Sequence, residues 1–192
     1  MFPIRLAFLL LALTTLTAKA GDWQLDPHTG EGRLEFEAIA TPGSLKIPGK
    51  IAKNKEKSFQ WLIKQKGGKL LAVGKFKVED FDTGMALRNS HLKENYLQVA
   101  KFPEATFKLN ALPWPEDKRE VASSGIPFTG ELTLHGKTKT VSGELTASKK
   151  EKGTEMKFRF PIHLGDFEIP IPSFMGVNVA EEVWVTAEFA PR

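Results

Sequence analysis

A two-residue alternation of apolar and polar side chains returns along the chain and constrains its fold more than any other feature. In residues 128–134 the even positions are apolar or glycine and the odd positions are polar, and residues 156–164 repeat the pattern with large apolar side chains on one face. Shorter runs of the same kind cover residues 33–38, 141–146 and 183–189. Because successive side chains of a strand point to opposite faces, this pattern predicts antiparallel strands with one face in water.

Turn signals separate these runs. Gly67-Gly68 divides residues 58–66 from 69–79, and Gly136-Lys137 divides 128–135 from 138–147, so each pair predicts a two-residue hairpin. The chain shows no repeat, no low-complexity tract and no linker. We therefore expect one domain over residues 21–192.

Unpaired edge strands of such a sheet could pair with other chains, and closure of the sheet into a barrel removes these edges completely. The sequence predicts an all-β fold, an antiparallel barrel of about eight strands, whose lumen is just wide enough for side chains or one slim ligand. Phe, Leu, Val and Ala dominate the inward positions. These side chains either fill the core or line a tunnel, and alternation alone leaves both interpretations open.

The first 20 residues have the pattern of a cleaved signal peptide. Arg5 precedes an apolar run over residues 6–16, and Ala18-Lys19-Ala20 provides a small-x-small cleavage site. The run is shorter than the roughly 20 residues of a membrane-spanning helix. We expect cleavage after Ala20 and export to the periplasm or the exterior, with no transmembrane segment in the mature protein.

Composition excludes several function classes. The chain has no cysteine, so thiol catalysis and thiolate metal sites are excluded. The net charge of +4 is carried by dispersed lysines, whereas a nucleic-acid site needs a concentrated basic face. No His-Glu-x-x-His pattern, nucleophile elbow or phosphate-binding glycine loop is present. We expect no nucleic-acid partner, no metal, no cofactor and no catalytic group.

Residues 84–100 break the strand pattern. Their apolar positions recur at three- and four-residue spacings, which predicts one or two short helices that end before Pro103. Arg88 and His91 are three positions apart and would share a helix face. They either bind the head group of a ligand, or Arg88 bonds backbone carbonyls or a carboxylate and fixes the helix to the barrel.

Three ordered blocks resemble the YceI-like family: residues 87–93 (LRNSHLK), 101–107 (KFPEATF) and 128–139 (FTGELTLHGKTK). The resemblance covers essentially all of residues 21–192. It implies a lipocalin-like barrel that binds a long-chain polyisoprenoid, quinone-like or related amphiphilic lipid inside. The candidate tunnel-lining residues are Phe36, Ala38, Trp61, Phe76, Leu92, Tyr96, Phe102, Phe107, Leu132, Leu134, Phe158, Phe160, Phe174, Val185 and Phe189.

Three hypotheses about function follow. The first is a periplasmic carrier that sequesters a lipid in the lumen, with residues 84–100 as a lid. The second is a stress-response or interaction scaffold with a filled barrel. The third is a lipid-modifying enzyme in which His91 acts as a general base and Arg88 binds an anionic group. A homodimer is an open alternative for the assembly.

Overall fold

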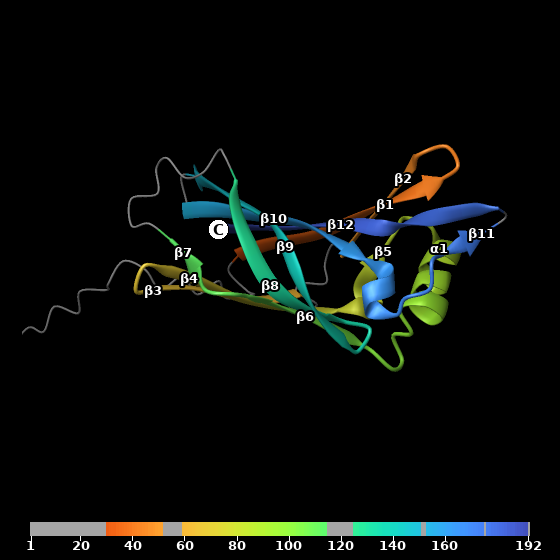
Figure 1. Ribbon diagram of the computed structural model, residues 1–192, viewed down its shortest axis with the longest axis horizontal. Helices are drawn as coiled ribbons and strands as arrows, with labels where there is room; N and C mark the ends of the chain where they lie inside the picture. The colour runs from red at the N-terminus through yellow and green to blue at the C-terminus, as the bar shows by residue number, and fades with distance from the viewer. Residues whose placement is uncertain (1–29, 52–58, 115–124, 151–152, 175, 192) are drawn as a thin grey trace, which may run out of the picture.

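The computed structural model describes residues 30–51, 59–114, 125–150, 153–174 and 176–191. Most of them lie in strands of one antiparallel sheet (Figure 1). The strands are β1 (Gly30–Thr41), β2 (Leu45–Ile51), β3 (Phe59–Lys66), β4 (Lys69–Lys77), β5 (Phe81–Asp82), β6 (Glu104–Leu109), β7 (Leu112–Pro113), β8 (Ile126–Leu134), β9 (Lys137–Lys150), β10 (Gly153–His163), β11 (Ser173–Phe174) and β12 (Val177–Pro191). The helical elements are η2 (Val78–Asp80), α1 (Ala86–His91), η3 (Leu92–Tyr96) and η4 (Leu164–Phe167).

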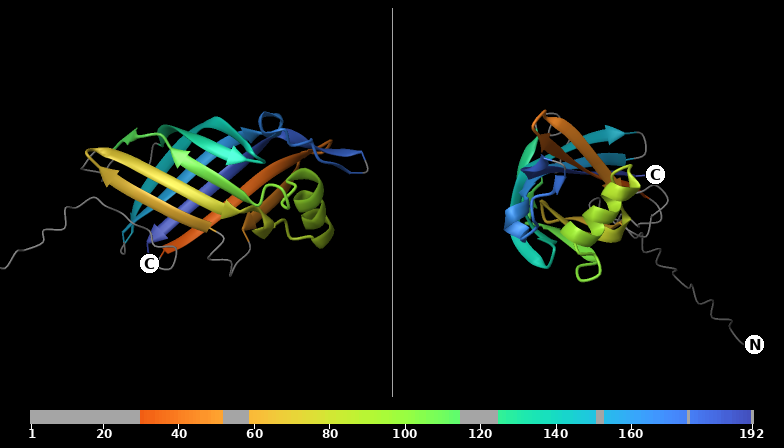
Figure 2. Two further views of the ribbon diagram at one scale, coloured as in Figure 1. Left: turned by 90° about the horizontal axis from the view of Figure 1, so that it is seen from below. Right: turned by 90° about the vertical axis from the view of Figure 1, so that its right-hand side faces the viewer.

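The sheet curls into a barrel, as predicted. Its order is β3-β4-β6-β8-β9-β10-β12-β1-β2-β5, with β7 on β4 and β11 on β12. β4, the neighbour of the edge strand β3, leads through η2 into β5, which pairs with β2 and forms the opposite edge, so the chain itself connects the two ends of the sheet (Figure 2). Among the described residues the sheet has 12 strands where about eight were expected, and three of them, β5, β7 and β11, have only two residues each.

The alternation read from the sequence matches the burial of side chains. Along β4 exposed and buried residues alternate without a break, and β6 follows the same rule. On β8, Phe128, Gly130, Leu132 and Leu134 are buried. On β10 the even-numbered residues 156–162 are buried. The inward positions of these strands therefore lie in the interior of the barrel.

The two predicted hairpins are present, one of them shifted by a residue. Gly67 and Gly68 form the β3–β4 turn with φ angles of 57° and 70°. The β8–β9 turn is His135-Gly136, with φ angles of 50° and 72°, and not Gly136-Lys137 as predicted. A turn of this kind needs positive φ at both central residues. The His135 ring is buried beside this turn, where its Nδ1 forms a 2.9 Å hydrogen bond with the Phe167 carbonyl.

Residues 84–100 contain the predicted short helical segment. α1 and η3 follow each other directly and lie at one end of the barrel, beside β5 and β11 (Figures 1 and 2). No helix among the described residues has the length and apolar character needed to span a membrane. We use the term helical cap for residues 86–96.

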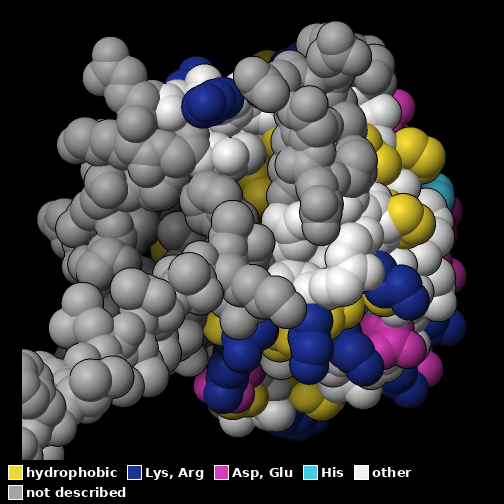
Figure 3. Space-filling model, turned by 90° about the vertical axis from the view of Figure 1, so that its left-hand side faces the viewer, with side chains coloured by type: hydrophobic (Ala, Val, Ile, Leu, Met, Phe, Trp, Pro, Cys, Tyr) yellow, Lys and Arg dark blue, Asp and Glu magenta, His cyan; other side chains and the backbone are white. Residues whose placement is uncertain are grey.

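Charged side chains lie on the outer face of the strands in mixed pairs. Lys75 pairs with Glu104 at 2.7 Å, and Lys157 pairs with Glu188 at 2.8 Å across adjacent strands. At the end opposite α1, the described surface also shows basic and acidic side chains intermingled (Figure 3). The surplus of lysine is thus spread over the wall of the barrel.

The core at the end away from α1 is built from aromatic rings. Trp61 and Phe189 meet edge to face with centroids 4.2 Å apart, and Phe128 and Phe158 meet at 5.4 Å. Gly74 lies directly opposite Trp61 on the neighbouring strand, and a Cβ there would come within 2.7 Å of the indole. The glycine thus leaves the space that the indole occupies. The rings that we call the aromatic core are Phe59, Trp61, Phe107, Phe128, Phe158 and Phe189.

Candidate functional site

A cavity of about 570 Å³ occupies the half of the barrel next to the helical cap. Its volume lies within the range of pockets that hold small organic ligands. Inward side chains of β1, β4, β8, β10 and β12 form its wall, and the helical cap and residues 169–173 contribute to it at the end. The lining is overwhelmingly apolar, so the cavity suits a hydrocarbon better than a polar substrate.

The mouth is marked by residues that line the cavity and are also exposed. Met85 and Leu87 are 57% and 60% exposed, and Val177 at the start of β12 is 42% exposed. Leu45 at the start of β2 and Ile171 in the connection before β11 are 66% and 49% exposed. Since water reaches all of these side chains, the cavity opens at the end that carries the helical cap.

Most of the residues predicted to line a tunnel lie on this cavity. Those that do are Phe36, Ala38, Phe76, Leu92, Tyr96, Leu132, Leu134, Phe160 and Val185. Arg88 and His91, the two candidates for polar contacts, line it as well. The side chain of Phe174 lies outside the described residues.

The other candidates are placed elsewhere. Trp61, Phe107, Phe158 and Phe189 belong to the aromatic core and do not contribute to the cavity wall. Phe102 packs against the His135 ring, with centroids 4.5 Å apart, beside the β8–β9 turn. The barrel is therefore packed at one end and open at the other. Inward side chains fill the core in the half away from α1 and line a cavity in the half next to it.

Some wall residues were missed by the sequence analysis. Leu34, Ile162 and Val183 share the inward parity of the predicted residues on their strands, so alternation identifies them once the open half is known. Ile169 and Pro172 reach the cavity from the connection between η4 and β11. No periodic pattern marks such loop residues.

A hydrogen-bond network fixes the helical cap to the barrel. The Asn89 side-chain oxygen accepts from the Thr83 backbone N–H and from its hydroxyl, both at 2.7 Å. The Asn89 amide donates to the Asp82 carboxylate at 2.7 Å, and the Gly84 N–H donates to the same oxygen at 2.8 Å. Asn89 is thus the central anchor of α1, a role that the sequence analysis did not assign.

Arg88 takes part in the same anchor. Its guanidinium donates to the Thr83 carbonyl, which is the structural contact that the sequence left as one of two alternatives. Its Nε is buried and has no hydrogen-bond partner among the described residues. Arg88 therefore ties α1 to the barrel and keeps one buried donor at the cavity wall.

The network depends on an ionised Asp82. The Asn89 amide and the Gly84 N–H hold the pKa of Asp82 below its ordinary value of 3.8, because both donate to the carboxylate. A group with a lowered folded pKa stabilises the folded state above its unfolded pKa, and this stabilisation is lost as the pH falls through the folded pKa. The attachment of α1 should therefore weaken in acid.

We expect amide hydrogen exchange in residues 83–91, corrected for intrinsic rates, to accelerate as the pH falls below 3.8. Asp82→Asn keeps an acceptor oxygen but cannot titrate, so the variant should lose this pH dependence. Amides of β8 serve as the internal reference. Equal acid sensitivity in both proteins would contradict the role of Asp82.

The structure offers few groups for other chemistry. Among the described residues, no cluster of His, Asp and Glu could hold a metal ion. Glu35 is the sole acidic residue among the described residues that line the cavity, but it has the outward parity on β1 and its exposed carboxylate lies 3.9 Å from the Arg33 guanidinium. The Tyr96 hydroxyl accepts a long hydrogen bond of 3.4 Å from the Ser173 N–H, which links η3 to β11. The Tyr96 hydroxyl can orient a ligand at the mouth, whereas a pair of carboxylates for acid–base catalysis is not provided by the described wall.

Solved structures share this architecture. The chain is similar to BcnA of Burkholderia cenocepacia, with a TM-score of 0.65 and 20% identity over 85% of this chain and 97% of that one. A polyisoprenoid-binding domain from Saccharophagus degradans matches with a TM-score of 0.55 and 13% identity over 84% and 94% of the two chains. The YceI protein of Campylobacter jejuni gives 0.53 and 18% over 76% and 85%. At these identities the likeness establishes the fold.

Curated relatives agree in sequence. A UPF0312 protein of Enterobacter sp. strain 638 is 32% identical over 137 residues, which cover 70% of this chain and 65% of that protein. Protein YceI of Salmonella paratyphi B is 41% identical over 64 residues, or 33% and 30% of the two chains. The model of the YceI-like domain matches residues 23–190. The chain therefore belongs to the YceI-like family.

Proposed function

We propose that this protein is a periplasmic carrier that binds the apolar chain of an isoprenoid or related amphiphilic lipid in the open half of its barrel. The observation that carries the proposal is the 570 Å³ apolar cavity with its mouth at the helical cap. Similarity to a polyisoprenoid-binding domain supports the ligand class. The signal-peptide pattern of residues 1–20, which lie outside the described residues, supports the compartment.

Burial of hydrocarbon alone provides enough affinity. Each methylene removed from water contributes about 0.8 kcal/mol, so a dozen buried carbons contribute on the order of 10 kcal/mol. Several kcal/mol of association and ordering entropy oppose this gain. The remainder is sufficient for useful affinity without any reactive or charged group in the cavity.

The mechanism is sequestration. The tail enters between the helical cap and the start of β12, and the head group stays near the mouth. There Arg88 and His91 of α1, Tyr96 of η3 and Ser173 of β11 line the cavity. The helical cap restricts the opening, which is the role expected of a lid.

The filled-scaffold hypothesis is favoured by one observation, the aromatic core that occupies the other half of the barrel. A scaffold would gain nothing, however, from an open apolar cavity. An enzyme would need an acid–base pair at the ligand, and the one acidic residue of the described wall, Glu35, has the outward parity on β1. The carrier therefore accounts for more of the structure than either alternative.

Native mass spectrometry tests the proposal. Protein isolated from the periplasmic fraction should show the mass of a chain that begins at Gly21, with a one-to-one adduct that organic extraction releases as a prenyl or other long-chain lipid. The same spectrum reports the oligomeric state. A clean ligand-free mass, unchanged after incubation with prenyl alcohols and with fatty acids, would refute the carrier. Recovery of the uncleaved chain from the cytoplasm would refute the compartment.

A further inference from the structure

The cavity ends on two aromatic side chains, Phe76 of β4 and Phe160 of β10. Both line the cavity, and both are almost completely buried, with 5% and 4% of their surface exposed. Phe76 stacks on Phe59 with centroids 5.6 Å apart, and Phe160 stacks on Phe107 at the same distance. Each ring thus faces the cavity on one side and the aromatic core on the other. We call this pair the cavity floor.

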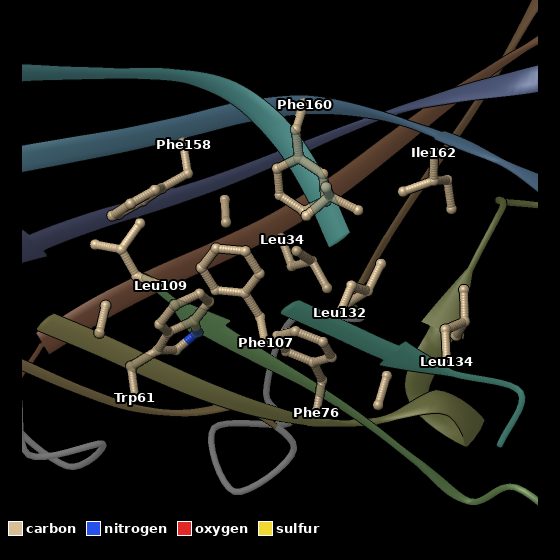
Figure 4. Close-up of a cluster of buried hydrophobic side chains, with 14 of the residues drawn as sticks. Leu34, Trp61, Phe76, Phe107, Leu109, Leu132, Leu134, Phe158, Phe160 and Ile162 are labelled. Carbon is tan, nitrogen blue, oxygen red and sulfur yellow. The ribbon is translucent and has the colours of Figure 1, made fainter. Parts of the chain in front are cut away.

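Behind the floor the barrel is closed. Phe158 and Phe107 are 0% and 1% exposed, and the Trp61 and Phe189 rings meet at 4.2 Å. Figure 4 shows Trp61, Phe107 and Phe158 on one side of the floor, with Leu132, Leu134 and Ile162 on the other. A chain that enters at the mouth therefore meets packed rings halfway along the barrel.

The size of the cavity then limits the length of the bound chain. We infer that Phe76 and Phe160 restrict the ligand to a tail of about four prenyl units, an inference that rests on the proposed carrier function. A methylene takes roughly the volume of one water in the liquid, about 30 Å³, so the cavity accommodates on the order of 20 carbons. The corresponding ligand is a short-chain prenyl lipid.

A longer tail is disfavoured for a simple reason. Its surplus units would lie outside the mouth in water, or would have to displace rings that are packed to the density of a protein interior. Transfer of such a tail from a lipid phase to the protein exposes apolar surface that the lipid phase had covered. The penalty grows with each unit that does not fit, so discrimination by length should be strong.

The test is a competition between geranylgeraniol and solanesol, which have four and nine prenyl units, delivered from the same detergent micelles and measured by native mass spectrometry. We expect occupancy by geranylgeraniol to exceed that by solanesol at least about tenfold, because several surplus units are exposed. Equal occupancy, or a preference for solanesol, would overturn the length limit and leave the carrier function intact. Failure of both alcohols, and of farnesol, to bind would refute the carrier function itself.

A matched pair of variants tests whether the cavity floor sets the limit on the length of the bound chain. Phe160→Ala removes six heavy atoms from the floor, about the size of one prenyl unit, and should raise occupancy by the five-unit alcohol geranylfarnesol relative to geranylgeraniol. Phe158→Ala removes the same atoms two residues away on β10, where the side chain does not reach the cavity. Phe158→Ala should leave the ratio of geranylfarnesol to geranylgeraniol occupancy unchanged. An equal shift in both variants, or in neither, would overturn the assignment.

A variant that narrows the cavity provides an independent readout if the alanine variants do not fold. Ala105 of β6 lies opposite Phe76 in the β4–β6 register, lines the cavity and is 2% exposed. Ala105→Leu adds three carbons beside the floor. It should shift the preference from geranylgeraniol toward the three-unit farnesol, and an unchanged preference would contradict the position of the floor.

Discussion

Replacing Trp61 with alanine is expected to lower the free energy of unfolding by about 3–5 kcal/mol. The indole is 7% exposed and touches rings on several strands, among them Phe76 of β4 at 6.0 Å and Phe189 of β12 at 4.2 Å. Its loss leaves a cavity where strands far apart in the sequence meet. Urea unfolding followed by circular dichroism measures the change through a shift of the midpoint with little change of slope.

Trp184 is the matched control for this substitution. It lies on the outer face of β12, where its indole N–H donates to Glu182 at 2.9 Å and the Arg159 guanidinium lies 3.8 Å above the ring. An exposed cation–π contact contributes about 0.5–1 kcal/mol, so Trp184→Ala should cost roughly that amount. Equal costs for the two tryptophans would contradict the packed aromatic core.

A milder variant separates ring packing from the indole nitrogen. Trp61 Nε1 is buried and has no hydrogen-bond partner among the described residues. A buried polar group without a partner is unfavourable. Trp61→Phe keeps a ring in the core and removes this nitrogen, so it should cost much less than the alanine variant.

The strands and the parity of their side chains could be predicted from the sequence because both depend on local pattern. Leu132 and Leu134, for example, were assigned inward from alternation alone, and both line the cavity. The β8–β9 turn was misplaced by one residue. There the His135 ring forms a hydrogen bond with the Phe167 carbonyl, 32 residues away, and no local pattern marks such a contact.

The division of the barrel into a packed and an open half could not be predicted. Phe158 and Phe160 have the same residue type, strand and parity, yet one is enclosed by rings and the other faces the cavity. What separates them is their height along the barrel axis, which depends on strand register and therefore on pairing between distant segments. The role of Asn89 was missed for a different reason: its partners Thr83 and Asp82 are only six and seven residues away, but which side chain of α1 reaches them depends on how the helix meets β5.

The strongest effect on ligand binding is expected from Ala38→Phe. Ala38 is a small residue on the cavity wall, 6% exposed, and a phenyl ring there would extend into space that the ligand needs. Since the ring fills a void, stability should change little, whereas affinity for geranylgeraniol should fall at least about tenfold through the loss of several buried carbons. Native mass spectrometry and urea unfolding on the same sample measure the two effects.

Ala147→Phe is the matched control, and it separates the carrier from the filled scaffold. Ala147 of β9 is also 6% exposed, but it lies in the packed core and does not reach the cavity. A phenyl ring there overfills the interior and should cost about 1–3 kcal/mol of stability. If the cavity is open, Ala38→Phe should lose the ligand and keep its stability. Ala147→Phe should lose stability, while its folded fraction still binds the ligand. If Ala38→Phe destabilises the protein as strongly as Ala147→Phe, the space beside Ala38 is already filled, and the barrel acts as a scaffold rather than a container.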